Sequence, residues 1–252
     1  MSDYDLIASF YDIEHAHYDE DVDLYRDFAT VCNGPVLELA CGSGRLLVPL
    51  AEEGYEVTGV DTSANMLKLA RQRLEHAGVA SRCKLVQQDM CSLQLEQKFR
   101  LAFIALGSFA HVYARKQQQQ ALAVVRAHLT PGAMFVLDIA NADARYMENM
   151  SGQVLHQGTW QDHDGAILTH LVSPAESATR HLLELTHFYD HYGQGEPVRR
   201  TMIKTWVYLF ERVEMELLLE HADFMIKDVY GDYELGPLER ESPRMIFRAE
   251  AR

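Results

Sequence analysis

The fold is decided by residues 36–47, VLELACGSGRLL, and by residues 55–61, YEVTGVD, a short way along the chain. The first stretch predicts a short apolar strand that runs into a turn. Gly42 and Gly44 in this turn lack Cβ atoms, so a ligand can lie against the backbone where a helix begins. The second stretch predicts a strand ending in Asp61, whose carboxylate can accept hydrogen bonds from both hydroxyls of a ribose. The two strand ends therefore predict one shared nucleotide-type ligand.

Dinucleotide oxidoreductases use similar parts, but three details favour another ligand. The oxidoreductase motif has a third small residue three positions after its second glycine, where this chain has Leu47. Glu38, in the strand that approaches the turn, would repel a pyrophosphate but attract the cationic amino-acid part of S-adenosylmethionine (SAM). A further strand over residues 85–90 reaches Asp89, which can accept a hydrogen bond from an adenine amino group. The order Glu38, Asp61, Asp89 favours SAM.

These segments resemble the class I SAM-dependent methyltransferases. Residues 38–44, ELACGSG, are similar to the family's first motif with Ala40 at its leading glycine position, residues 59–67 to its second, and residues 88–90 to its adenine motif. The resemblance implies SAM as cofactor and S-adenosylhomocysteine as its product. The implied contacts are the 42–44 backbone with the methionine part, Asp61 with the ribose, and Asp89 and Met90 with the adenine. The full predicted cofactor set is Glu38, Ala40, Gly42, Gly44, Asp61, Thr62, Met66, Asp89, Met90 and Leu106.

The rest of the chain predicts an α/β fold. Helix and strand patterns alternate over residues 35–141, which is typical of a parallel sheet with helices on both faces. Alternating apolar and polar residues over 154–208 predict a small antiparallel β insertion, with turns at 162–165, 173–174 and 193–197. A helix with Phe210, Val213, Leu217 and Leu218 on one face and strands at 224–230 and 245–249 then complete a Rossmann-like, seven-stranded, mostly parallel sheet.

Four regions are expected along the chain. They are an N-terminal helical lid segment (1–34), the SAM-binding core (35–150), the antiparallel β insertion (151–208), and the last helix with the closing strands (209–252). The insertion lies between the last two units of the sheet, so it is expected above the ligand-binding edge. This place favours a substrate lid, with the surface of a homodimer as the alternative.

A narrower resemblance concerns the acceptor. Residues 4–12, YDLIASFYD, and the β-rich insertion resemble small-molecule methyltransferases that N-methylate amino sugars or glycine, and residues 230–233 and 242–247 resemble a bacterial group of such enzymes. The resemblance implies methyl transfer to N or O of a small-molecule acceptor. Two alternatives stay open: a SAM-binding or cyclase-like protein without methyl transfer, and a nucleotide-dependent oxidoreductase.

Methyl transfer needs alignment and exclusion of water, and a base only if the acceptor is protonated. His111, which follows the predicted strand at 101–106, is the first candidate base, with a solvated loop histidine as the alternative. Tyr11 is the second, with a packing role as its alternative. No metal site is predicted, because His187 and His191 on one strand would lie roughly 13 Å apart, too far for one ion.

The amino-acid composition indicates which classes of partner are not expected. With 37 acidic residues against 23 basic ones and a formal net charge of −14, the chain has no basic tract for phosphates, so nucleic acid is not expected as a substrate. No apolar run reaches the roughly 20 residues that a bilayer requires, and the acidic start is unlike a secretory leader. The four cysteines have no CxxC spacing. A cytoplasmic enzyme with reduced thiols is expected.

Overall fold

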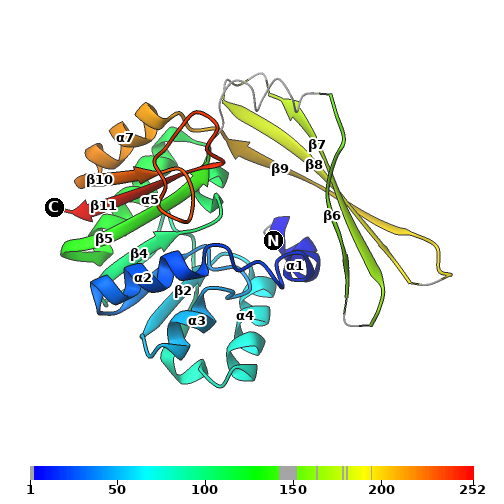
Figure 1. The fold of residues 1–252 in the computed structure, drawn as a ribbon, viewed down its shortest axis with the longest axis horizontal. Helices are drawn as coiled ribbons and strands as arrows, with labels where there is room; N and C mark the ends of the chain where they lie inside the picture. The colour runs from blue at the N-terminus through cyan, green and yellow to red at the C-terminus, as the bar shows by residue number, and fades with distance from the viewer. Residues whose placement is uncertain (1–2, 142–151, 163, 178, 180, 194) are drawn as a thin grey trace.

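The computed structural model describes residues 3–141, 152–162, 164–177, 179, 181–193 and 195–252. Its larger sheet has seven strands in the order β10-β11-β5-β4-β1-β2-β3, in which β11 runs antiparallel to its two neighbours (Figure 1). The strands are β1 Val36–Leu39, β2 Val57–Asp61, β3 Cys83–Gln87, β4 Phe99–Ile104, β5 Leu129–Ala140, β10 Phe224–Tyr230 and β11 Arg244–Ala251. The predicted mostly parallel, seven-stranded sheet is confirmed.

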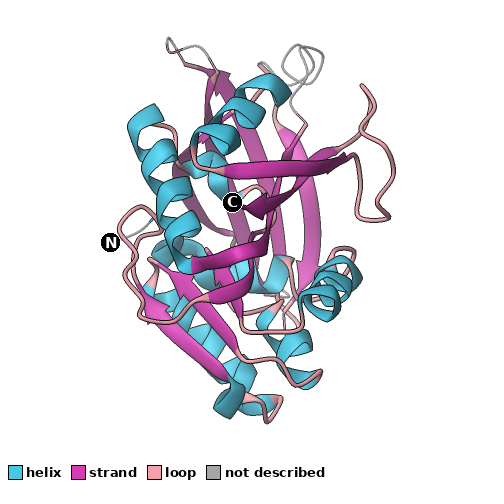
Figure 2. Cartoon of the chain, turned by 90° about the vertical axis from the view of Figure 1, so that its left-hand side faces the viewer, coloured by secondary structure: helices cyan, strands magenta, loops and turns pink. Residues whose placement is uncertain are grey.

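Helices lie on both sides of this sheet, as Figure 2 shows. One side carries α2 Val22–Cys32, α3 Leu47–Glu52 and α4 Ala64–His76, and the other carries α5 Arg115–His128 and α7 Arg212–His221. Short 3₁₀ helices lie at Ala80–Arg82 (η1) and Ser108–His111 (η2). Because both faces are covered, β1 is buried at every position. Its side chains alternate between two cores, with Leu37 and Leu39 in one and Val36 in the other.

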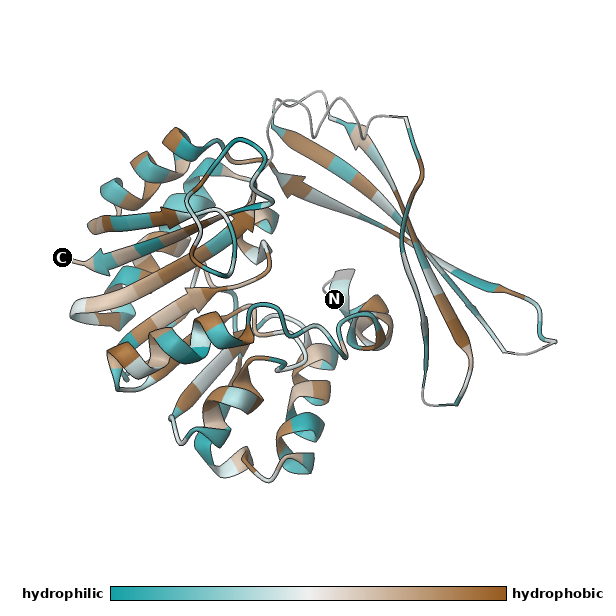
Figure 3. Cartoon of the chain, in the orientation of Figure 1, coloured by the Kyte–Doolittle hydropathy of each residue, from teal (hydrophilic) through white to brown (hydrophobic). Residues whose placement is uncertain are grey.

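A second sheet lies between β5 and β10 of the first in sequence. It is antiparallel, with strands β6 Leu155–Gln161, β7 Ile167–Glu176, β8 Leu182–Tyr192 and β9 Arg199–Tyr208 in that order. Its strands alternate between apolar and polar segments in Figure 3, because one face packs inward and the other faces solvent. The expected boundary at residues 150–151 lies outside the described residues.

Two local predictions are wrong. Ser173 and Pro174 lie within β7 and form no turn. Pairing of β6 with β7 ends at Val172, so Pro174, which has no N–H to donate, lies where β7 has no partner strand on that side among the described residues. In α7 the buried face carries Met215, Leu218 and Leu219, whereas the predicted face residues Val213 and Leu217 are exposed.

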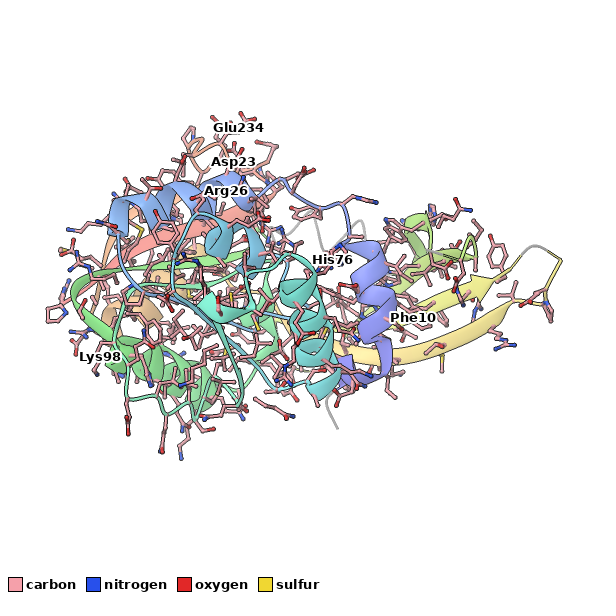
Figure 4. All side chains as sticks on the ribbon, turned by 90° about the horizontal axis from the view of Figure 1, so that it is seen from below. Phe10, Asp23, Arg26, His76, Lys98 and Glu234 are labelled. Atoms are coloured by element: carbon pink, nitrogen blue, oxygen red, sulfur yellow. The ribbon has the colours of Figure 1, made fainter. Side chains whose placement is uncertain are left out.

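Helix α1, Asp3–Glu14, lies between the two sheets (Figure 1). On one side Ile7 packs in a buried cluster with residues of the second sheet, and the Phe10 ring (labelled in Figure 4) stacks on Tyr189 with the ring centres 5.2 Å apart. On the other side Asp5 accepts a hydrogen bond from Ser63 Oγ at 2.5 Å, and Asp12 pairs with Arg73. The helix therefore joins the β insertion to both ends of α4. Among the described helices, none combines the length and the apolar character that a membrane span requires.

Candidate active site

A cavity of about 760 Å³ opens at the carboxyl ends of β1, β2 and β4 and beside the loop after β3. Ligands of open α/β sheets bind at this edge. All predicted cofactor and catalytic residues line the cavity except Glu38 and Gly44; those that do are Tyr11, Ala40, Gly42, Asp61, Thr62, Met66, Asp89, Met90, Leu106 and His111. Residues from five separate segments of the chain thus line one cavity.

The turn after β1 has left-handed backbone at Ala40, Gly42 and Gly44, with φ values of 56°, 53° and 78°. A Cβ atom at Gly42 would meet only Tyr11, at 3.9 Å, so the missing side chain leaves room toward the cavity. A Cβ at Gly44 would lie 3.0 Å from the Cβ of Ala70 in α4. Gly44 is therefore small because a helix packs against it, and not because it forms the cavity wall.

Asp61, at the end of β2, is held by backbone groups. Its Oδ2 accepts a hydrogen bond from Gly42 N at 2.9 Å, and its Oδ1 accepts one from Ser63 N at 2.8 Å. Burial raises the pKa of Asp61, and these N–H groups oppose that rise. Each oxygen keeps a second lone pair. The carboxylate is therefore oriented to accept from a vicinal diol.

Glu38 does not line the cavity, because it lies in β1 beneath the turn and is only 4% exposed. Its Oε2 is buried and has no hydrogen-bond partner among the described residues. Burial raises the pKa of this carboxyl well above its ordinary value, while nearby Arg45 lowers it. A buried carboxylate oxygen without a donor is costly unless a ligand supplies one. An ammonium group would do so, which fits the amino-acid part of SAM.

Asp89 lies in the loop after β3 and is exposed toward the cavity. Its Oδ1 accepts from Cys91 N at 2.7 Å, which fixes the carboxylate, and the apolar side chains of Met66 and Met90 line the same cavity. A planar base with an exocyclic amino group fits such a lining.

His111 ends the 3₁₀ helix η2 on the other side of the cavity. Its Nδ1 lies 3.1 Å from the carbonyl oxygen of Trp206, and its Nε2 lies 2.9 Å from the Tyr4 hydroxyl. A carbonyl oxygen cannot donate, so Nδ1 carries the proton and, in the neutral ring, Nε2 accepts from Tyr4. The base candidate therefore lines the cavity with its Nε2 hydrogen-bonded to a tyrosine hydroxyl that lines it too.

Tyr11 stacks on His15, with ring centres 3.9 Å apart. Burial, with Glu14, Glu38 and Asp61 nearby, raises the pKa of its hydroxyl, against the opposing effect of Arg45. A phenol of this kind stays protonated at neutral pH. Tyr11 is thus suited to hydrogen bonding and less suited to accept a proton.

Sequence reasoning missed three groups of residues. Tyr4 from α1 and Thr205 and Trp206 from β9 line the cavity. Asp138, fully buried in β5, accepts from Leu106 N at 3.0 Å and from Arg244 at 2.5 Å, and so holds the turn at Leu106. An aspartate inside the apolar strand 133–139 was a usable signal, whereas nothing local marks Thr205 and Trp206. In the described part of the chain, no group of three or more His, Cys, Asp or Glu side chains is placed to hold a metal ion.

Comparisons with known proteins agree with this geometry. Residues 36–132 match a methyltransferase domain family. The chain is 26% identical to the putative methyltransferase YqeM of Bacillus subtilis, over 98% of this chain and 96% of that one. It is 28% identical to dTDP-3-amino-3,6-dideoxy-alpha-D-glucopyranose N,N-dimethyltransferase of Streptomyces fradiae, over 52% of each chain. The crystal structure of a SAM-dependent methyltransferase from Clostridium acetobutylicum matches with a TM-score of 0.81 at 21% identity, over 99% of both chains. The matched domain and the order of the acidic residues at the edge of this sheet lead to one conclusion: the chain carries a class I SAM-dependent methyltransferase domain.

Proposed function

We propose that this enzyme moves the methyl group of SAM to an amine nitrogen of a small molecule. The observation that carries the proposal is the continuity of the cavity, which runs from Asp61 and Asp89 to the Tyr4–His111 pair. Methyl transfer from SAM to a small molecule needs these two halves side by side. Nitrogen is favoured over oxygen because the relative from Streptomyces fradiae is named as an amino-sugar N,N-dimethyltransferase.

The residues that hold SAM are proposed as follows. Glu38 accepts from the ammonium group, the backbone at Ala40 and Gly42 carries the methionine part, Asp61 accepts from the ribose, and Asp89 accepts from the adenine amino group. Bound SAM supplies an electrophilic methyl group on a sulfonium. The protein's own part is to align the acceptor nitrogen with that methyl group and to exclude water.

An amine is largely protonated at neutral pH, so it must lose a proton before it can attack. Tyr4 is placed to take that proton while passing its own to Nε2 of His111, because the two atoms are 2.9 Å apart. The Trp206 carbonyl, 3.1 Å from Nδ1, stabilises the resulting imidazolium. Tyr11, with its raised hydroxyl pKa, is assigned to positioning by hydrogen bonding.

The α1 helix and the second sheet are proposed to cover the acceptor, because α1 supplies Tyr4 and Tyr11 to the cavity and β9 supplies Thr205 and Trp206. The formal net charge of −14 also supports a small cationic acceptor over a nucleic acid. Four unpaired cysteines are consistent with a reducing compartment such as the cytoplasm.

A screen for S-adenosylhomocysteine release tests the proposal. Primary and secondary amines, including amino sugars and glycine, are compared with phenols and carboxylates at equal concentration. Thermal unfolding provides the binding control: SAM and S-adenosylhomocysteine should raise the melting temperature by mass action, and NAD should not. Turnover confined to phenols or carboxylates would contradict nitrogen as the acceptor, and stabilisation by NAD alone would contradict the SAM site.

A further inference from the structure

Four side chains, three from the second sheet and one from α1, form a continuous hydrogen-bonded chain. Glu14 Oε1 at the end of α1 lies 3.0 Å from His170 Nδ1 in β7, and His170 Nε2 lies 3.0 Å from His187 Nδ1 in β8. His187 Nε2 lies 2.8 Å from Thr205 Oγ1 in β9. Three adjacent strands and one helix thus each contribute one member. His170 and Thr205 are 5% and 4% exposed, whereas the Glu14 side chain retains 15% exposure.

This chain connects two cavities. Thr205 lines the large cavity of the active site, and His170 and His187 line a second cavity of about 260 Å³ next to it. The two cavities share Leu106 and His111 as walls. The hydrogen bond between Thr205 and His187 therefore crosses the partition between them, and the four-residue chain runs from the active site to the partly exposed Glu14.

The direction of the hydrogen bonds follows from Glu14. A carboxylate only accepts, so His170 donates from Nδ1. In neutral His170 the other nitrogen is then an acceptor, so His187 donates from Nδ1, and Thr205 donates its hydroxyl proton to Nε2 of His187. Thr205 has only this one proton to donate. Its oxygen can therefore only accept hydrogen bonds from anything in the active-site cavity.

Packing of the sheet alone does not require two histidines and a threonine at these positions. Burial, reinforced by His170 and opposed by Glu14, lowers the pKa of His187 to about 4, with His111 on η2 acting in the same direction as His170. Tyr189 stacks on His170 with ring centres 4.2 Å apart, and burial keeps its hydroxyl protonated by raising its pKa. His187 is thus neutral at physiological pH and keeps an acceptor nitrogen. Apolar side chains would pack these strands at lower desolvation cost.

We propose that the chain Glu14–His170–His187–Thr205 recognises the acceptor's N–H group at Thr205 and conducts its proton to Glu14. This inference rests on the proposed N-methyl transfer. Tyr4 and His111 take the proton that the ammonium group loses before attack, and methyl transfer then leaves the nitrogen cationic again. The excess proton of this methylated nitrogen moves to Thr205 Oγ1 as the hydroxyl proton moves to His187 Nε2. The Nδ1 proton of His187 then moves to His170 Nε2, and that of His170 to the Glu14 carboxylate, which passes it to water. In the preceding transfer the free electron pair of the nitrogen forms the new C–N bond, while the C–S bond breaks and leaves its pair on sulfur; the later loss of the proton to Thr205 leaves the neutral N-methylated amine.

Sinefungin provides a probe that does not require the acceptor to be known. It carries an amine where SAM carries its methyl group, and S-adenosylhomocysteine carries nothing there. Binding of both compounds is measured calorimetrically in the full chain and in the variants Thr205→Val, Thr205→Ser, His187→Gln and Glu14→Gln. Thr169→Val, on the same sheet but outside both cavities, is the matched control.

The expected result is a selective loss of sinefungin binding. Thr205→Val, His187→Gln and Glu14→Gln should lower sinefungin affinity about tenfold relative to S-adenosylhomocysteine, as the loss of a charge-assisted hydrogen bond predicts. Thr205→Ser and Thr169→Val should keep the parental ratio. S-adenosylhomocysteine affinity reports that each variant is folded. The conservative Glu14→Gln change keeps the test decisive if a histidine variant does not fold.

If Thr205→Val and Glu14→Gln still bind S-adenosylhomocysteine and keep the parental ratio of sinefungin to S-adenosylhomocysteine affinity, the inference is overturned and the proposed function stays intact. Failure of the parent protein to bind either compound would instead overturn the SAM site itself. An equal loss for both compounds would assign the chain a structural role in closing the site, and would also overturn the inference.

Discussion

Glu38 is a buried carboxylate whose ligand is expected to supply its missing donor. Glu38→Gln should weaken SAM binding about tenfold, because an ammonium group loses a charged partner.

The raised pKa of Glu38 also makes the stability of the protein depend on pH. Above pH 4.5, the ordinary pKa of glutamate, Glu38 of the unfolded chain loses its carboxyl proton, whereas Glu38 of the folded protein without SAM keeps it. The free energy of unfolding therefore falls as the pH rises from 4.5 toward the raised pKa of the folded state. In urea unfolding between pH 4.5 and 7, the free energy of unfolding should fall less steeply with pH in Glu38→Gln than in the parent protein. An identical slope would contradict the assignment.

Asp61 is expected to accept two ribose hydrogen bonds. Asp61→Ala should therefore raise the dissociation constant of SAM by about 10–100-fold, equivalent to roughly 1.5–3 kcal/mol. Part of the loss comes from freeing the N–H groups of Gly42 and Ser63, so circular dichroism must accompany the binding measurement. Asp23→Ala removes the same charge from a side chain that is 93% exposed, and serves as the control. A folded Asp61→Ala variant with parental affinity would contradict the pocket assignment.

Variants of Tyr4 and His111 distinguish a role of this pair in proton transfer from a role in positioning the acceptor. If the pair accepts the amine's proton, Tyr4→Phe and His111→Ala should each lower kcat by roughly 10²–10⁴-fold with SAM affinity nearly unchanged. The double variant should cost little more than either single one, because the two groups act as one unit. A change confined to the Michaelis constant of the acceptor would instead show that the pair only shapes the site.

At the scale of elements, Asp5 is one of the residues that bind α1 to the core. Asp5 accepts from Ser63 Oγ at 2.5 Å and from Asn65 N at 3.3 Å, next to the cavity residues Thr62 and Met66. Asp5→Ala should therefore speed S-adenosylhomocysteine dissociation several-fold and lower the melting temperature by several degrees, because each lost hydrogen bond contributes about 1 kcal/mol. Stopped-flow displacement measures the rate. An unchanged rate would show that α1 does not retain the ligand.

At the scale of the whole molecule, the second sheet is attached to a core that carries the proposed cofactor residues by itself. Replacing residues 154–205 by a short linker should abolish turnover and preserve SAM binding in weakened form. The deletion removes Thr205 and uncovers Ile7, which packs against Leu168, Tyr189 and Ile203. Calorimetry with SAM and an S-adenosylhomocysteine release assay give the two readouts. Complete loss of SAM binding in a folded core would contradict a role restricted to the acceptor.

Local sequence patterns were sufficient to predict the parallel core and the cavity residues nearest the strand ends. Strand periodicity, the glycine turn and acids at strand ends are local signals, and parallel strands bring their carboxyl ends to one edge wherever they pair. Asp61, Asp89 and Met90 could therefore be placed together from the sequence alone. The two local errors, at Pro174 and on α7, arose because the end of a strand pairing and a solvent-facing apolar side chain depend on neighbours that are distant in sequence.

The surroundings of the acceptor, in contrast, depend on tertiary packing. Tyr4 and His111 are 107 residues apart, and Glu14 and His170 are 156 apart, so no local spacing connects them. Their meeting depends on α1 docking between the two sheets, which buries Ile7 on one side and ties Asp5 to Ser63 on the other. The tautomers of the histidines likewise depend on which carbonyl or carboxylate each one meets. Local sequence patterns thus specified the strand ends, whereas packing between remote segments created the part of the cavity that is proposed to hold the acceptor.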